Sequence, residues 1–308
     1  MDSQTNSSTK LDVYQLVTDQ IIKLLERGVI PWQRPWNAGL PMNLLSKRQY
    51  RGINLWLLLS LNYDQNFFLT WDQLKSIGGS VNKGEQGHIV VYWKPPQKKV
   101  EQEKENKQKF VSTLRYYKVF NLAQCRDIPS SLLPTLQLRL SDSNPMLECK
   151  AIIHAMPDSP RIQHKGQEAY YNIEKDLINM PSKKSFISIE SYYSTLYHEL
   201  VHSTGSEKRL GRKTLCDMAP FGTESYAMEE LIAEMGSAFL SRFSEIMPNE
   251  IKNTVAYLDN WLEVFKKDKR FLIIASGQAQ KAVDYILGRK ESESKDELLE
   301  TLEESVVS

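Results

Sequence analysis

The sequence predicts an α+β protein of two domains, and three observations support this prediction. At 308 residues, the chain is about twice the usual length of one domain. Strand-like stretches occur in the first half, whereas four apolar segments with helical spacing dominate the second half. A segment rich in Ser, Pro and Leu, residues 129–148, separates the halves as a linker. We therefore expect an N-terminal α+β domain with a β-hairpin and a mostly helical C-terminal domain.

The N-terminal domain is expected over residues 11–128, after a disordered tail at residues 1–10 that is rich in Ser, Thr and Asn. Its expected elements are a helix over 11–25 that ends near Gly28, a helix or strand over 51–60, a helix capped by Thr70 and Gln73, and strands over 88–94 and 115–122. Between the last two strands, the polar residues 98–109 read as a solvated hairpin excursion.

The C-terminal domain is expected over residues 149–290, and an acidic tail follows at residues 291–308. Two short extended stretches precede the helices. They are expected around 161–164 and 169–173, and the helices at about 189–204, 224–244, 249–267 and 273–287.

Charge is unevenly distributed along a chain whose formal net charge is +1. Residues 1–128 carry 18 Lys and Arg against 11 Asp and Glu, which favours a polyanionic partner or, equally, an ordinary solvated surface. The three Cys residues form no CxxC pair, and no signal peptide or bilayer-length apolar run is visible. We therefore expect a cytoplasmic protein with reduced thiols and no membrane segment.

The sequence His198-Glu199-Leu200-Val201-His202 is the most specific motif in the chain. On a helix, residues four apart share a face, so the two imidazoles can bind one Zn²⁺ ion. Glu199 would then be the catalytic base that accepts a proton from the metal-activated water. Other divalent metals fit the same ligands, and two metal-free helix histidines are the alternative interpretation. Tyr226 or Arg209 is the candidate for stabilising the oxyanion.

A third protein ligand is needed, and no His follows His202. Residues 229–234 resemble the second-helix signature of the gluzincins. This resemblance implies that Glu230 is the metal ligand and that Glu234 orients a ligand imidazole without binding the metal itself. Glu229 is the alternative ligand, although a solvated position on the helix surface is the simpler expectation for it. Asp217 and Glu224 are further options in the loop before this helix.

Aromatic and basic residues alternate in the first half, a pattern that suits single-stranded nucleic acid. Bases stack on aromatic rings, and cations follow the phosphates. We expect Trp56 and Trp71 to belong to the core, whereas Trp32 and Trp36 lie in a Pro-rich loop and are candidates for stacking. The candidate DNA-binding residues are Trp32, Arg34, Trp36, Tyr50, Arg51, Asn54, Lys83 and Trp93.

The chain resembles the ArdC-type antirestriction proteins of conjugative elements, and its first half is also similar to a region of the TraC-type plasmid primases. The resemblance rests on PWxxPW at 31–36, PMN at 41–43, YRGIN at 50–54, FLTW at 68–71, GGxVxKGE at 78–85, HELVHSTG at 198–205, RLxR at 209–212 and YAxEELxAE at 226–234. It implies a single-stranded-DNA-binding domain joined to a zincin-like metallopeptidase domain, and a role in shielding incoming DNA from host restriction.

Three functions remain open from the sequence. In the first, the protein binds single-stranded DNA and its metallopeptidase domain cleaves an unidentified protein substrate. The second is a DNA-coating protein whose zinc site is purely structural, although a structural site would need no base at Glu199. The third is a cytosolic zinc peptidase whose N-terminal half recognises protein.

Overall fold

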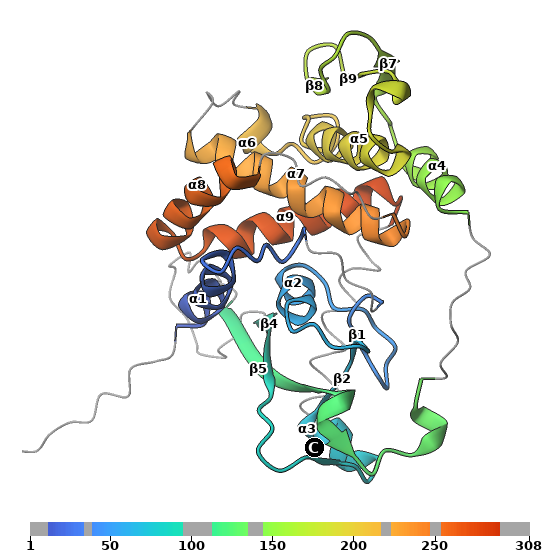
Figure 1. Ribbon diagram of the computed structural model, residues 1–308. Coiled ribbons are helices and arrows are strands. Elements are labelled where there is room, and N and C mark those ends of the chain that lie inside the picture. Colours follow the sequence, from blue (N-terminus) through green and yellow to red (C-terminus); the bar gives the residue numbers. More distant parts are fainter. Residues whose placement is uncertain are drawn as a thin grey trace, which may run out of the picture.

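The computed structural model describes residues 12–33, 39–94, 113–134, 144–216, 223–246 and 254–289. The expected tails at 1–10 and 291–308, the excursion at 98–109 and part of the linker lie outside these residues. In the first half, the elements are α1 (Val13–Leu25), β1 (Met42–Asn43), α2 (Ile53–Leu59), β2 (Phe67–Thr70), α3 (Trp71–Ser76), β3 (Ser80–Val81), β4 (His88–Lys94), β5 (Thr113–Asn121) and β6 (Cys125–Arg126) (Figure 1). The predicted α+β class is confirmed.

The sheet of the first half has the strand order β1-β2-β5-β4. β4 and β5 pair antiparallel from His88↔Val119 to Lys94↔Thr113, which is the ribbon of the predicted hairpin. The segment 51–60, which periodicity left undecided, contains α2. Six of the seven residues of α2 are buried, and burial on all sides removes the one-sided pattern that identifies a surface helix.

Helix starts in the first half follow local capping chemistry. α1 begins at Val13 because the side chain of Asp12 accepts from the backbone N–H groups of Tyr14 and Gln15. α3 begins after Thr70, and the predicted capping box with Gln73 is present in both directions.

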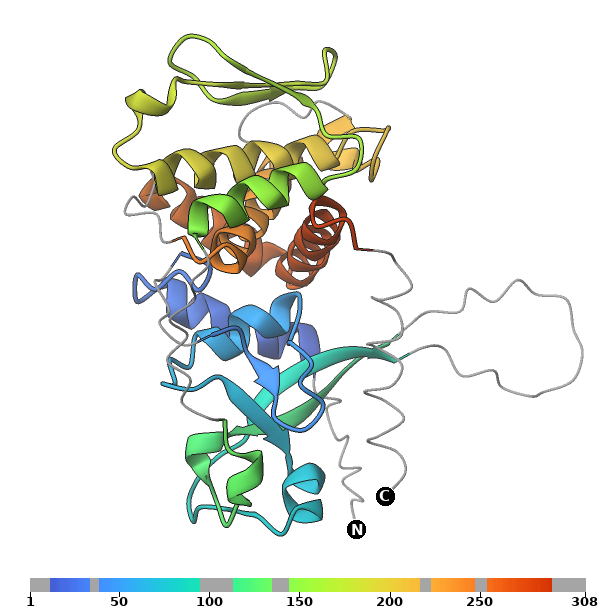
Figure 2. The ribbon, with the colours of Figure 1, turned by 90° about the vertical axis from the view of Figure 1, so that its right-hand side faces the viewer.

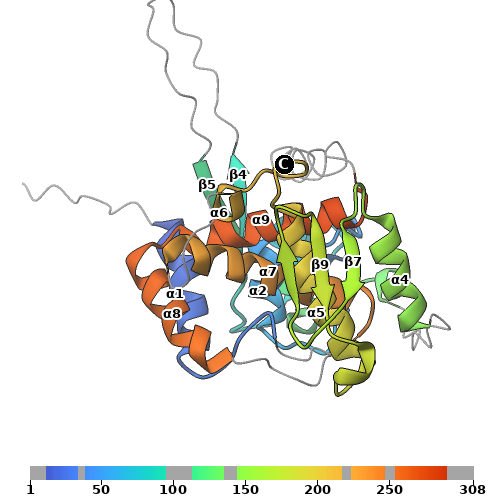
Figure 3. The same ribbon diagram turned by 90° about the horizontal axis from the view of Figure 1, so that it is seen from above.

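The second half contains α4 (Pro145–Ala155), β7 (Arg161–His164), β8 (Tyr170–Asn172), β9 (Leu177–Met180), α5 (Ile189–Thr204), α6 (Lys213–Cys216), α7 (Glu224–Phe243), α8 (Thr254–Lys267) and α9 (Phe271–Ile286). The three strands form a small sheet of order β7-β9-β8 that lies over α5 (Figure 3). α4 begins inside the segment that we expected to be linker. Asn144 caps it and Pro145 occupies its first turn, a helix start that the sequence displays.

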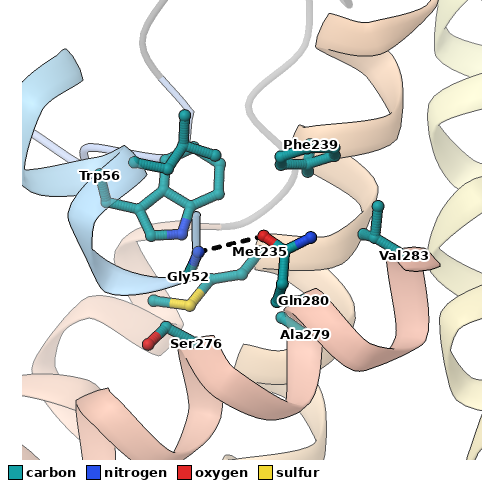
Figure 4. A pocket seen from close by; sticks show the side chains of 9 residues that line it. Gly52, Trp56, Met235, Phe239, Ser276, Ala279, Gln280 and Val283 are labelled. Carbon is teal, nitrogen blue, oxygen red and sulfur yellow. Dashed lines mark hydrogen bonds between the residues drawn. The ribbon is translucent and has the colours of Figure 1, made fainter. Parts of the chain in front are cut away.

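The two halves are packed against each other through α1 and α2, which lie between the helices of the second half and the sheet of the first (Figure 2). The largest hydrophobic cluster is continuous across this boundary. The Trp32 ring meets that of Trp261 edge to face, with 5.6 Å between centroids. The backbone N–H of Gly52 donates to Oε1 of Gln280 at 3.0 Å, and φ of Gly52 is 54°. This hydrogen bond lies beside a small pocket between α2, α7 and α9 (Figure 4).

Among the helices within the described residues, none combines the length and apolar character that crossing a bilayer would require.

Helices α5 and α7 approach closely at a glycine. A Cβ added at Gly236 would lie 2.7 Å from Cγ2 of Val201, closer than carbon atoms pack. We expect Gly236→Ala to lower the free energy of unfolding by about 1–3 kcal/mol, because the β-branched Val201 has little freedom to move away. Chemical denaturation monitored by circular dichroism measures this change.

Gly277→Ala in α9 is the matched control, since a Cβ at this exposed helical position meets no atom within 4 Å. It should raise the free energy of unfolding by up to about 1 kcal/mol through helix propensity alone. Equal effects of the two substitutions would show that the contact at Gly236 does not limit the packing of α5 on α7.

Candidate metal centre

The two histidines of the HExxH motif and the glutamates of the second motif lie on two packed helices. α5 carries His198 and His202 one turn apart, near its C-terminal end, and α7 carries Glu230 opposite them. Ser188 caps α5 through the N–H of Ser191, which places the histidines in the last two turns. The helix pair therefore brings together residues that are about 30 positions apart in the sequence.

The three predicted ligands present their donor atoms to one point. The separations are 3.0 Å between the two Nε2 atoms, 3.5 Å from His198 Nε2 to Glu230 Oε2, and 3.6 Å from His202 Nε2 to Glu230 Oε1. Donors at the corners of a tetrahedron around zinc lie ~3.3 Å apart, given bond lengths of ~2.0–2.1 Å. In number, chemistry and spacing, this donor set fits a divalent metal ion.

Each imidazole also has a carboxylate beside its other nitrogen. Nδ1 of His202 lies 3.2 Å from Oε1 of Glu229, and Nδ1 of His198 lies 3.8 Å from Oε1 of Glu234. Glu229 is within hydrogen-bond distance of Nδ1, so it can fix the orientation of the His202 ring and leave Nε2 free for a metal, whereas Glu234 interacts with His198 mainly through its charge. Glu234 and Glu229 thus lie in corresponding positions beside the two rings.

The expectation that Glu229 lies on a solvated helix surface is wrong. Its side chain is 5% exposed, and Arg212 binds it through two nitrogens at 2.6 and 3.1 Å. Thr214 donates a further hydrogen bond to it at 2.6 Å. Burial opposes ionisation, but the hydrogen bonds from His202 and Arg212 outweigh it and hold the pKa of Glu229 far below its usual value. Glu229 is therefore a buried, charged support for His202.

The electrostatic environment of His198 favours positive charge. Burial lowers the pKa of its imidazole, but the hydrogen bond to Glu230 and the charges of Glu234 and Glu199 raise it to about 9. Glu199 itself is 7% exposed. Burial likewise opposes ionisation of Glu230, yet its contacts with the two imidazoles and Tyr226 lower its pKa. A site with this surplus of carboxylates attracts a cation, whether a proton or a metal ion.

The two candidates for stabilising an oxyanion occupy different environments. Arg209 is fully covered and joins the loop after α5 to the small sheet through Asp176 and the carbonyl oxygen of Asp158. It therefore has a structural role. Tyr226 hydrogen-bonds Glu230 and lies at the start of α7, within the centre. Glu224 is exposed in the first turn of α7, and Asp217 lies outside the described residues.

Four candidate DNA-binding residues make contacts within the protein. Trp32, a candidate for stacking in a Pro-rich loop, is 3% exposed and belongs to the core. Arg51 forms an ion pair with Asp284 of α9. Asn54 uses its amide to bond the backbone of Val91 in both directions at 2.7 Å. Tyr50 packs on Phe68, and burial raises the pKa of its phenol.

Other aromatic and basic residues of the first half lie at the surface. Trp93 is 42% exposed and Lys83 is exposed, whereas Arg34 and Trp36 lie outside the described residues. Trp71 is 46% exposed, so our expectation that it belongs to the core is wrong. Tyr116 belongs to the aromatic pattern of the first half but is not among our candidate DNA-binding residues. It is 38% exposed and lies two residues before Lys118 on β5, so both side chains lie on one face of the strand.

Two family models match the chain. A model of the N-terminal domain of anti-restriction factor ArdC matches residues 11–120, and a model of zincin-like metallopeptidases matches residues 150–278. Among curated proteins, the Sinorhizobium fredii protein y4eC is 28% identical over 312 residues, which cover 97% of this chain and 99% of that protein. An Escherichia coli DNA primase TraC is 31% identical over 299 residues, or 92% of this chain but only 20% of the primase.

Solved structures of an ArdC protein are similar to this chain over nearly its whole length. The antirestriction protein ArdC of plasmid R388 is 34% identical, and the alignment covers 90% of this chain and 97% of that one. The TM-scores are 0.70 for its Mn(II)-bound crystal structure and 0.71 for its metal-free structure. With both halves matched in this order, the chain belongs to the ArdC family of antirestriction proteins and carries that family's zincin-like metallopeptidase domain.

Proposed function

We propose that this protein binds single-stranded DNA through its N-terminal half and cleaves a protein substrate at a divalent metal centre. Together these activities would protect mobile-element DNA that enters a new host from restriction. The observation that carries the enzymatic part is the convergence of His198, His202 and Glu230 at ligand distances, with Glu199 on the same helix. A purely structural zinc site would not need the additional carboxylate of Glu199.

Zinc is the ion that we propose, because two imidazoles and one carboxylate at tetrahedral spacing suit it. The related ArdC of plasmid R388 has a Mn(II)-bound structure, so Mn²⁺ is the alternative. When bound, such an ion supplies Lewis acidity toward a carbonyl group and a water molecule. Glu199 would accept the proton of the attacking water, and Tyr226, whose hydroxyl donates to Glu230 in the structure, would turn to donate to the developing oxyanion.

Glu199→Gln tests the catalytic role of this residue. We expect cleavage of a peptide library from denatured cell proteins, read as new termini by mass spectrometry, to fall at least ~100-fold, because the general base is lost. Zinc content per chain, measured by elemental analysis, should stay at the wild-type level, since Glu199 is not among the three ligands.

His202→Ala is the companion variant, and it should lose both cleavage and bound zinc. Wild-type protein that binds zinc but generates no new termini would support the DNA-coating alternative with a structural metal. Undiminished cleavage by Glu199→Gln would remove Glu199 from the mechanism.

The DNA-binding part is supported by a row of exposed aromatic and basic side chains on the β4–β5 ribbon. Trp93 lies opposite Leu114, so the register places Trp93, Tyr116 and Lys118 on one face. The row continues to Trp71, whose ring lies 5.9 Å from that of Phe120 on the same face of β5. We call Trp93, Tyr116, Lys118 and Trp71 the aromatic strip.

Cations flank both ends of the aromatic strip. Nζ of Lys75 lies 5.7 Å from the centroid of the Trp71 ring. At the other end, Trp93 packs against Tyr14, over which the guanidinium of Arg270 lies at 5.5 Å. Exposed rings alternating with cations offer stacking surfaces to bases and charge partners to phosphates, a combination suited to unpaired strands. The strip therefore replaces the buried Trp32 as the proposed stacking surface.

Substitution of the aromatic strip should weaken binding of single-stranded DNA. For Trp93→Ala and Tyr116→Ala, we expect the dissociation constant for a labelled oligonucleotide to rise about tenfold or more, since one stacked base contributes ~1–3 kcal/mol. Lys118→Ala should also lower the slope of log affinity against log salt by ~0.7, the contribution of one phosphate contact. Fluorescence anisotropy of the full chain across a salt series measures both effects.

Tyr170→Ala is the control, because Tyr170 is an equally exposed aromatic residue on the sheet of the other half. It should leave DNA affinity unchanged. Equal affinity of the Trp93 and Tyr116 variants and the wild type would refute the strip, and no binding by the wild type at low salt would favour a protein-recognition role for this half.

A further inference from the structure

The metal centre is touched by a residue from the other half of the chain. Gln33, in the segment Pro31–Gln33 after α1, donates a hydrogen bond from Nε2 to Oε2 of Glu234 at 3.3 Å, across 201 positions of sequence. The other oxygen of the same carboxylate, Oε1, is the atom that lies 3.8 Å from Nδ1 of His198. Glu234 thus connects Gln33 with a proposed metal ligand.

The segment that carries Gln33 is held firmly against the second half. Pro31 and Trp32 are buried, and Trp32 packs on Trp261 of α8, itself 1% exposed. The backbone N–H of Gln33 donates to the carbonyl oxygen of Ile30 at 3.1 Å, which closes a turn before this side chain. Apolar packing thus fixes the backbone at Gln33. Because the backbone is already ordered, the half-buried side-chain amide can hydrogen-bond Glu234 with little further loss of conformational entropy.

We propose that Gln33 is a positioning residue of the metal centre, so that the N-terminal half completes the site that the C-terminal half carries. Gln33 holds one oxygen of Glu234, which restricts rotation of the carboxylate and keeps the other oxygen beside His198. Outer partners of this kind orient a ligand imidazole and raise its basicity toward metal. This inference rests on the proposed metal function of His198, His202 and Glu230.

Glu234 depends on Gln33 for its position because, within the part of the chain that the structure describes, it has fewer partners than Glu229. Glu229, the counterpart carboxylate beside His202, is clamped by Arg212 and Thr214. The Glu234 side chain is 24% exposed, and among the described residues it accepts a hydrogen bond from the side chain of Gln33. Its position therefore depends on a contact between the halves, whereas that of Glu229 depends on a network inside one half.

Metal binding tests this role without a protein substrate. The full chain is titrated with Co²⁺, whose visible absorption reports coordination geometry, and then with Zn²⁺ against a competing chelator. We expect Gln33→Met, which keeps the side-chain length but removes the donor, to weaken Co²⁺ and Zn²⁺ binding about 3- to 10-fold. The expected loss of affinity is no larger than the 10–100-fold loss that is typical when a residue in direct contact with a metal ligand is removed. The Co²⁺ spectrum should shift as well, which a purely structural role would not cause.

A double-substitution cycle separates positioning through Glu234 from any general effect. Glu234→Gln alone should weaken metal binding, and adding Gln33→Met should then have little further effect, since residues that act through one contact are not additive. Gln49→Ala, at an exposed glutamine of the same half, should leave affinity and spectrum unchanged. Circular dichroism checks that each variant is folded.

The outcomes distinguish this inference from the function on which it rests. If wild type fails to bind Co²⁺ and Zn²⁺, or binds them undiminished after His202→Ala, the proposed metal centre is refuted and the inference with it. If wild type binds but Gln33→Met and Gln33→Ala bind equally well with the same spectrum, only the inference is refuted. Fully additive effects of Gln33→Met and Glu234→Gln would likewise exclude positioning through Glu234.

Discussion

The contact between α5 and α7 is the constraint on which the rest of the site depends. Val201, between the two histidines, packs directly on the backbone of α7 at Gly236. Only at this close approach can Glu230 reach both imidazoles from the opposite helix. The loop after α5 strengthens the same contact, because Arg212 binds Glu229 and also donates to the carbonyl oxygen of Val201 near the end of α5. The helix end and the site are thereby stabilised by one side chain.

The charges around this contact do not balance without a cation. Arg212 neutralises Glu229, but Glu199, Glu230 and Glu234 remain close to His198 and His202. The raised pKa of His198 expresses this imbalance, because a proton on the ring compensates part of the negative charge. A divalent ion compensates it better and requires both rings to be neutral at Nε2, so that metal binding releases protons. The same carboxylates that hold the rings in place therefore also favour occupation by metal.

Local signals explain what the sequence predicted well. Helix α5 matches its predicted bounds because Ser188 and Gly205 mark its ends, and Thr70 with Gln73 gave α3 its start. The HExxH spacing and the signature at 229–234 identified the residues that converge, since helical periodicity determines which side chains share a face. The predictions that were wrong concerned which side chains are buried. Whether Trp32, Trp71 or Glu229 faces solvent depends on partners far away in sequence, such as Trp261, Phe120 and Arg212.

The segment Pro31–Gln33 shows why this distinction matters for function. A Trp in a Pro-rich loop with basic neighbours resembles a DNA-binding element when only the sequence is considered. In the structure, Trp32 belongs to the hydrophobic cluster shared by both halves, and elsewhere in the interface Arg51 pairs with Asp284 of α9. Separation of the halves would expose this apolar surface to water, at a cost of several kcal/mol. The packing of the halves therefore joins the aromatic strip and the metal centre in one body.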